Sequence, residues 1–299
     1  MSRESEFRYK YGVFGAGAVS RSLIGSLAAR TPELGPVAAA SFRVASRIAN
    51  TLQGGFAVRE TSDLRVARVV LFHAPADVLA AHLALLSEAE MEWAGRCVIL
   101  CHCEAPLENL TILAEKGASI ATVREFGVNG FVAAHGAEDA MKAAMRICHL
   151  LHLHTVEIQP GRQAQFDAGV TLATAAITPL IDRVAWLLRG AGAREGEASR
   201  LAAILVEQSA RGFAHSGRQS WVWHIQKPDE QQLKQQLAAC AGDLRELLRT
   251  LLVMGFDLFG RHKEVGEALG TSDRRPSIER EMTDCREIKP AAKATNALE

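Results

Sequence analysis

Residues 11–27 constrain the fold of this chain more than any other segment. An apolar run at 11–14 leads into Gly15-Ala16-Gly17-Ala18-Val19-Ser20, and residues 23–27 then carry apolar side chains at helical spacing. A strand, a glycine turn and a helix start bring backbone N–H groups up to a pyrophosphate. Gly15 allows the tight turn, Gly17 lacks a side chain that would block the phosphate, and small Ser20 replaces the usual third glycine. The segment predicts a dinucleotide site over Gly15 to Ser20, although an ordinary strand–helix turn shares this pattern.

The first 160 residues alternate apolar strands with helices, as a parallel sheet requires. Strands are predicted at residues 11–14, 37–41, 68–72, 96–101, 119–123 and 155–158, and helices at 20–30, 47–52, 107–116 and 138–151. We therefore predict an α/β fold in which residues 1–160 form a doubly wound (Rossmann) sheet of about six to eight strands.

The pattern changes after residue 160, where helical periodicity replaces the strands. Residues 166–189 are apolar nearly all round, which is typical of a helix buried in a domain core or a subunit interface. Further helices are predicted at 197–215 and 229–259. We expect an all-helical substrate and dimerisation domain over residues 161–270, followed by a polar tail over 271–299.

Charge and composition exclude several partners. The 34 basic residues balance the 34 acidic ones, so no general attraction to nucleic acid or to an anionic membrane is predicted. No uninterrupted apolar run reaches the length of a membrane span, and the polar start does not look like a signal peptide. Six scattered cysteines suit a reducing compartment. We predict a cytoplasmic protein that binds neither nucleic acid nor a membrane.

The residues after the second predicted strand bear on the nucleotide. Sites for NAD usually place an acidic residue there to bind the ribose 2′-hydroxyl. This chain has Ser41-Phe42-Arg43, with Arg47 one helical turn further on. A hydroxyl and a guanidinium suit a 2′-phosphate. The sequence therefore favours NADP(H) over NAD(H), while a solvated arginine after a strand is the alternative.

Several short motifs in this order resemble a known superfamily. Besides the turn at Gly15 to Val19, they are Ser41-Phe42-Arg43, Ala74-Pro75-Ala76-Asp77 and His102-Cys103-Glu104-Ala105. The chain resembles the superfamily of 6-phosphogluconate dehydrogenase, 3-hydroxyisobutyrate dehydrogenase and pyrroline-5-carboxylate reductase. Within it, the chain looks most like a branch in which a Rossmann-like domain precedes a helical domain of unknown function.

The resemblance implies a function and a set of contacts. It implies hydride transfer between NADP(H) and a small carbonyl, imine or hydroxy compound, in a homodimer formed through the helical domain. The cofactor would contact Gly15, Ala16, Gly17, Ala18, Val19 and Ser20 at the pyrophosphate, Ser41 and Arg43 at the 2′-phosphate, and His73, Ala74 and Pro75 at the nicotinamide ribose.

The chain also departs from the pattern of this branch. Arg124-Glu125 replaces a His-Pro pair, and Phe166-Asp167 replaces Tyr-His. The dehydrogenases of the superfamily use a lysine on the corresponding helix for proton transfer, whereas residues 162–178 contain no lysine. The candidates for a proton donor are His102, Asp167, Lys227 and Asp229. Two alternatives follow: a sensor or scaffold that binds NADP(H) without turnover, and an interaction protein whose glycine turn binds nothing.

No metal site is predicted. In Cys101-His102-Cys103 the histidine would point to the opposite face of a strand from the two thiols, so one ion could not bind all three.

Overall fold

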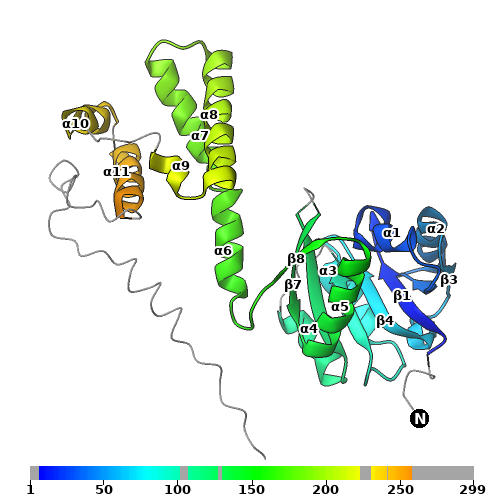
Figure 1. Cartoon of the computed structure of the whole chain (residues 1–299). Helices are drawn as coiled ribbons and strands as arrows, with labels where there is room; N and C mark the ends of the chain where they lie inside the picture. The colour runs from blue at the N-terminus through cyan, green and yellow to red at the C-terminus, as the bar shows by residue number, and fades with distance from the viewer. Residues whose placement is uncertain (1–6, 102–106, 127–129, 223–229, 241, 258–299) are drawn as a thin grey trace, which may run out of the picture. The chain divides into compact units, whose positions relative to one another are not determined.

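The computed structural model describes residues 7–101, 107–126, 130–222, 230–240 and 242–257 (Figure 1). The chain divides into two compact units, Met1–Val170 and Thr171–Glu299. The division falls within helix α6 (Gln163–Ala173).

The first unit contains one eight-stranded sheet, in the order β3-β2-β1-β4-β5-β6-β7-β8. The strands are β1 (Tyr9–Gly15), β2 (Leu34–Ala38), β3 (Phe56–Ala57), β4 (Ala67–His73), β5 (Cys97–Cys101), β6 (Ser119–Glu125), β7 (Phe131–Gly136) and β8 (His154–Glu157). All neighbours pair in parallel except β6 and β7, which are antiparallel. The predicted Rossmann-like α/β fold is confirmed.

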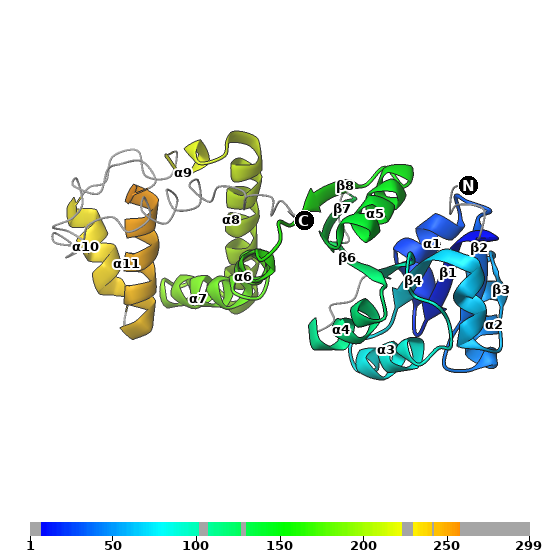
Figure 2. The ribbon, with the colours of Figure 1, turned by 90° about the horizontal axis from the view of Figure 1, so that it is seen from below.

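Helices cover both faces of this sheet (Figure 2). On one face lie α1 (Leu23–Ala28), α2 (Phe42–Leu52) and α5 (Glu138–Leu150), whose apolar residues join one buried cluster with the sheet. On the other face, α3 (Leu79–Ser87) and α4 (Leu107–Glu115) share a second cluster that includes Phe72 and Trp93. Because the sheet is buried on both faces, its central strands are almost continuously apolar.

The start of the chain differs from the prediction in one important detail. The helix expected over residues 20–30 is broken into a 3-10 turn, η2 (Val19–Arg21), and α1. Ser22 separates them, because its backbone is extended (φ −97°, ψ 177°) and its hydroxyl accepts the N–H of Ile24 at 3.3 Å. Gly25 permits the break, since a Cβ there would lie 2.0 Å from the Ser20 carbonyl oxygen.

Other boundaries shift by a few residues. Strand β2 ends at Ala38, earlier than predicted, and α2 begins at Phe42, so Ser41 caps a helix rather than ending a strand. The prediction placed no strand at β3 or at β7, which respectively extend the sheet at its edge and introduce the antiparallel pair.

The second unit contains helices, joined by turns, and no strand in its described residues. It contains α7 (Ile177–Gly190), α8 (Glu195–Ser216), α9 (Gln219–Val222), α10 (Glu230–Ala239) and α11 (Gly242–Asp257). The single helix expected at 229–259 is therefore two helices. Leu233, Leu237, Leu252 and Phe256 of α10 and α11 form the buried apolar cluster found in this unit's described part.

The helix predicted at 166–189 needs two corrections. It is interrupted by a turn at residues 174–176, between α6 and α7. It is also largely exposed within one chain, because α6 contains no buried residue and Ala185 is the buried residue of α7. By length and mean hydropathy (1.3), residues 163–190 are the one described segment long and apolar enough to cross a membrane, although Asp182 and Arg183 interrupt its apolar run.

Candidate functional site

The glycine turn after β1 packs against the residues that follow β4. The N–H of Ala16 donates to the carbonyl of His73 at 2.8 Å. Gly17 has φ +71°, and a Cβ on it would lie 2.7 Å from Cγ of Pro75. The structure thus brings the predicted residues Gly15 to Gly17 together with His73 to Pro75. It also gives a second reason for glycine at 17, which is contact with Pro75 rather than phosphate access alone.

Four successive backbone donors follow the bend. Within the described residues, the N–H groups of Gly17, Ala18, Val19 and Ser20 donate no hydrogen bond. Gly17, Ala18 and Ser20 are exposed. Backbone donors left without partners beside a positive-φ glycine form an anion-binding concavity. This turn can therefore accept a phosphate group.

The N-terminus of α1 does not belong to that concavity. Its first N–H, from Leu23, donates to the carboxylate of Glu125 at the end of β6. The Ser22 hydroxyl meanwhile donates to the Val19 carbonyl at 2.7 Å. The protein itself therefore satisfies the start of α1, and η2 is the element that borders the glycine turn.

The start of α2 is positively charged and capped by a serine. The Ser41 hydroxyl accepts the N–H of Val44 at 3.4 Å, and the first turn contains no acidic residue. Arg43 and Arg47 are exposed, and the guanidinium carbon of exposed Arg59 lies 4.8 Å from the ring centroid of Phe42. In the described part of the chain, none of these three arginines forms an ion pair with a carboxylate. Their charge is available to an anion.

The carboxyl ends of the central strands form a level row. Gly15 pairs with His73, and Cys101 pairs with Val123. Nδ1 of His73 lies 2.9 Å from the carbonyl oxygen of Cys101, so this ring nitrogen carries the proton. With strands about 4.8 Å apart, the end of β6 lies about 14 Å from the end of β1 along this edge.

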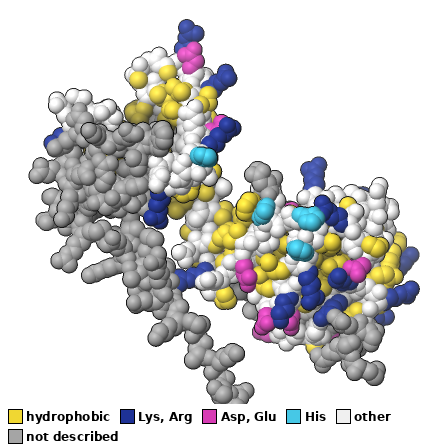
Figure 3. Space-filling model, in the orientation of Figure 1, with side chains coloured by type: hydrophobic (Ala, Val, Ile, Leu, Met, Phe, Trp, Pro, Cys, Tyr) yellow, Lys and Arg dark blue, Asp and Glu magenta, His cyan; other side chains and the backbone are white. Residues whose placement is uncertain are grey.

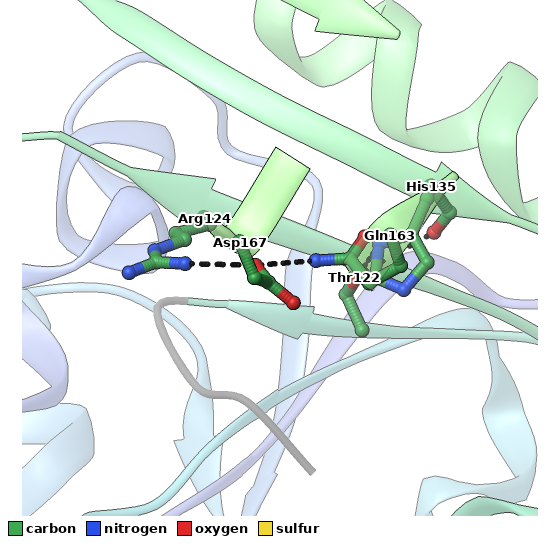
Figure 4. Close-up of polar contacts among 5 residues, drawn as sticks. All are labelled: Thr122, Arg124, His135, Gln163 and Asp167. Carbon is green, nitrogen blue, oxygen red and sulfur yellow. Dashed lines mark hydrogen bonds and ion pairs between the residues drawn. The ribbon is translucent and has the colours of Figure 1, made fainter. Parts of the chain in front are cut away.

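A polar cluster marks the end of β6 (Figure 4). Nη1 of Arg124 lies 3.3 Å from Oδ1 of Asp167, and Nε2 of Gln163 donates to the same oxygen at 2.9 Å. The side chains of Arg124 and Asp167 are 32% and 42% exposed. Beside them, the Thr122 hydroxyl hydrogen-bonds the imidazole of His135 across the β6–β7 pair. An arginine and an imidazole thus lie on one face of two neighbouring strands, and a carboxylate from α6 contacts the arginine.

Of the predicted proton donors, the structure places Asp167 alone. His102, Lys227 and Asp229 lie outside the described residues. In this arrangement Asp167 is the counter-ion of Arg124, and it accepts two hydrogen bonds on one oxygen.

Two residues near these groups, Gln163 and Arg59, were not predicted from the sequence. Gln163 lies four residues before Asp167 on α6, a spacing that indicates a shared helix face. Arg59 had no such signal, because β3, the short strand before it, was not predicted.

A cavity of about 420 Å³ lies elsewhere in the first unit. It is lined by residues from the end of α2 and from β3, including Asn50, Gln53 and Phe56. None of the predicted site residues lines it.

Comparison with solved structures identifies proteins of similar fold. A protein provisionally named an NADP oxidoreductase, from Bacteroides fragilis, matches with a TM-score of 0.64 and 12% identity over 84% of this chain and 98% of its own. A reductive aminase from Aspergillus terreus, in complex with NADPH and ethyl-5-oxohexanoate, matches at 0.56 and 14%, over 85% and 95%. A pyrroline-5-carboxylate reductase from Coxiella burnetii matches at 0.50 and 14%, over 88% and 96%.

These matches establish likeness of fold. The resemblance inferred from the sequence, a Rossmann-like sheet followed by a helical region as in pyrroline-5-carboxylate reductase, is confirmed at that level. One further match, an imine reductase variant from Myxococcus stipitatus, was solved with NAD+. No protein-family model matches the sequence, and no curated protein matches it.

Proposed function

We propose that this protein is an NADP(H)-dependent oxidoreductase that acts on a small carbonyl, imine or hydroxy compound. The observation that carries the proposal is the pair of anion-accepting features at one sheet edge. These are the four unpartnered N–H groups after Gly15 and the arginines around the start of α2. They flank the strand ends as the two phosphate regions of an NADP molecule require. Structures of similar fold contain NADPH, and one contains NAD+.

The chain's own groups have distinct tasks in this proposal. The N–H groups from Gly17 to Ser20 bind the pyrophosphate, while Arg43 and the Ser41 hydroxyl bind the 2′-phosphate. His73, Ala74 and Pro75 border the nicotinamide ribose, and the His73–Cys101 bond fixes the ends of β4 and β5 beneath it. The cofactor supplies a hydride. We assign cofactor binding to residues 1–160, and dimerisation to residues 161–270.

The proton that accompanies the hydride needs a separate group. Asp167 is the proposed candidate that lies within the described residues, and it is on the β6 side of the row of strand ends, where we expect the nicotinamide. Transfer from Asp167 requires that its carboxylate first take up a proton from solvent, and that its bonds to Arg124 and Gln163 loosen when substrate binds, because an ionised carboxylate has no proton to give.

Titration with NADPH and NADH tests the proposal. We expect NADPH to bind more tightly than NADH, and Arg43→Gln to reduce that preference about tenfold, as loss of a charge-assisted hydrogen bond would do. Arg146→Gln, which removes an exposed arginine from α5, is the matched control and should leave both affinities unchanged. Failure of both nucleotides to bind would refute the proposal and favour an interaction protein.

A second candidate is an NADP(H)-binding sensor or scaffold without turnover. The observation that favours it is the Arg124–Asp167 ion pair, because Arg124 occupies the carboxylate that would otherwise give the proton. Helix α6, which carries Asp167, has no lysine that could take over this role. NADPH binding without oxidation across a panel of ketones, oxo acids and imines would support the sensor. Steady NADPH consumption with any of them would exclude it.

We also propose that the protein forms a homodimer through its helical unit. Apolar side chains gather over α7 and α8 (Figure 3). In the described part of this unit, the large exposed hydrophobic residues are Leu172, Trp186, Leu201, Ile204, Leu205, Phe213, Leu247, Leu251 and Met254. Charged Asp182 and Arg183 interrupt the apolar segment, which favours a protein partner over a lipid bilayer. We propose a cytoplasmic location, since Cys97, Cys148 and Cys240 form no disulfide within the described residues.

A further inference from the structure

Arg124 lies where a substrate would meet the proposed cofactor. It follows Val123, which is level with Cys101, and the parallel strands β1, β4, β5 and β6 all end at this edge. Successive strand residues point to opposite faces. Thus Glu125 points towards α1, whereas Arg124 contacts Asp167 of α6.

The surroundings of Arg124 hold its guanidinium over an apolar wall. Its guanidinium carbon lies 5.3 Å from the ring centroid of Phe126, and that ring lies 5.9 Å from the ring of Phe166 on α6. An arginine that stacks on an aromatic ring presents its donors at the edge of its plane. The side chain is one-third exposed, so an anion from solution can reach it.

The contact with Asp167 is weaker than an arginine–carboxylate pair can be. One oxygen of Asp167 lies 3.3 Å from one nitrogen of Arg124, whereas two-point pairs have N–O distances of about 2.7–2.9 Å. Gln163 holds that same oxygen, and its own Oε1 is buried with no hydrogen-bond partner among the described residues. A buried acceptor without a partner indicates an arrangement that is not fully satisfied. A ligand carboxylate can replace this one-point contact with a two-point one.

We propose that Arg124 binds the carboxylate of the substrate, so that the substrate is a small oxo acid, or an imine derived from one, in its ionised form. This inference rests on the proposed oxidoreductase function and specifies its substrate class. The Aspergillus terreus reductive aminase was solved with the ethyl ester of such an acid, ethyl-5-oxohexanoate. The present chain is expected to prefer the acid itself.

A matched pair of ligands tests the inference without requiring turnover. Calorimetric titration of the full chain, saturated with NADP+, would compare 5-oxohexanoate with its ethyl ester. We expect the acid to bind at least about tenfold more tightly than the ester, as a charge-assisted two-point contact predicts. The preference should vanish in Arg124→Gln, persist in part in Arg124→Lys, and remain in the control Arg146→Gln. Circular dichroism of each variant verifies its fold.

Each outcome decides the inference. Equal affinities, a preference for the ester, or an acid preference that survives in Arg124→Gln would each overturn it, as would absence of acid binding. Failure of the proposed function has a different signature, since neither NADPH nor NADP+ would bind. If 5-oxohexanoate then still bound the cofactor-free protein in an Arg124-dependent manner, the carboxylate site would stand and the reductase would not.

Discussion

The two units of this protein bury their apolar residues to very different extents. The first unit places apolar clusters on both faces of its sheet, and residues such as Phe14, Phe72 and Trp93 are almost fully enclosed. In the described part of the second unit, the buried cluster holds four residues, and Leu172 and Phe213 are 68% and 60% exposed.

This contrast separates two roles. A sheet packed on both sides is stable by itself and can hold a turn such as Gly15–Ser20 in one conformation. Helices that leave large side chains in water gain stability by covering them with another protein surface. We therefore expect the first unit to carry cofactor recognition by itself, and the helical unit to depend on its partner.

The largest expected effect is on association. Leu205→Glu places a charge in the exposed apolar face of α8 and should raise the dimer dissociation constant about 100-fold or more, since a buried unpaired charge is costly. Ala203→Glu adds the same charge about 200° around the helix and should have little effect. Sedimentation equilibrium measures both. If the wild-type protein were a monomer at micromolar concentration, the proposal that the helical unit depends on a partner would be contradicted.

The second-largest effect is expected in thiol labelling, at urea concentrations below those that unfold the protein, which should distinguish the two units. Burial raises the pKa of the Cys97 and Cys148 thiols, so less thiolate is available at pH 8 and native labelling is slow. Cys240, in the helical unit, should react at least about tenfold faster than either when the protein opens locally. Mass spectrometry locates the label. Equal rates at all three positions would indicate one cooperative unit.

Glu125 offers a test confined to the first unit. Glu125→Ala removes the acceptor of the Leu23 N–H and should lower the free energy of unfolding of that unit by about 1–2 kcal/mol. Glu125→Gln keeps an oxygen acceptor, so it should lower the free energy of unfolding by about half as much as Glu125→Ala. Urea unfolding followed by far-ultraviolet circular dichroism measures the loss. A larger loss in the helical unit than in the first would contradict the separation of the two.

The smallest expected effect concerns Asp167. Asp167→Asn removes the counter-charge of Arg124, so 5-oxohexanoate should bind about two- to fivefold more tightly, as for loss of a partly exposed ion pair. If Asp167 also donates the proton, turnover should fall in the same variant. Calorimetry and NADPH oxidation separate the two effects, and weaker binding of the acid would argue against the proposed exchange of carboxylates.

Sequence reasoning recovered the sheet because its evidence is local. Strands such as β4 and β5 are continuous apolar runs between turn residues, and the glycine turn after β1 is a contiguous motif. The strand signal is weak in β3, which has two residues, and in β7, whose two alanines and glycine are depleted in strands, and both were missed. The break at Ser22 was missed as well, because it depends on the contact of Gly25 with the Ser20 backbone.

The candidate site likewise contains some residues that local sequence predicted and others that it could not predict. The turn residues and Ser41-Phe42-Arg43 were found from their neighbours in sequence. The partners of Arg124, Glu125 and Phe42 lie 43, 102 and 17 residues away, and no periodicity joins them. Of the two locations predicted for residues 166–189, a core within one chain is excluded by their exposure, and a subunit interface stays a prediction. The sequence could not choose between them, because an apolar helix face has the same sequence whether it packs within its own chain or against a partner.

Backbone amide signals followed during an NADPH titration would test the central claim most directly. The account predicts that the amide resonances of Gly17, Ala18, Val19 and Ser20 shift together on binding, with those of Phe42 and Arg43 at the start of α2. NADPH binding that leaves the resonances from Gly17 to Ser20 unmoved, or no binding at millimolar NADPH, would contradict it.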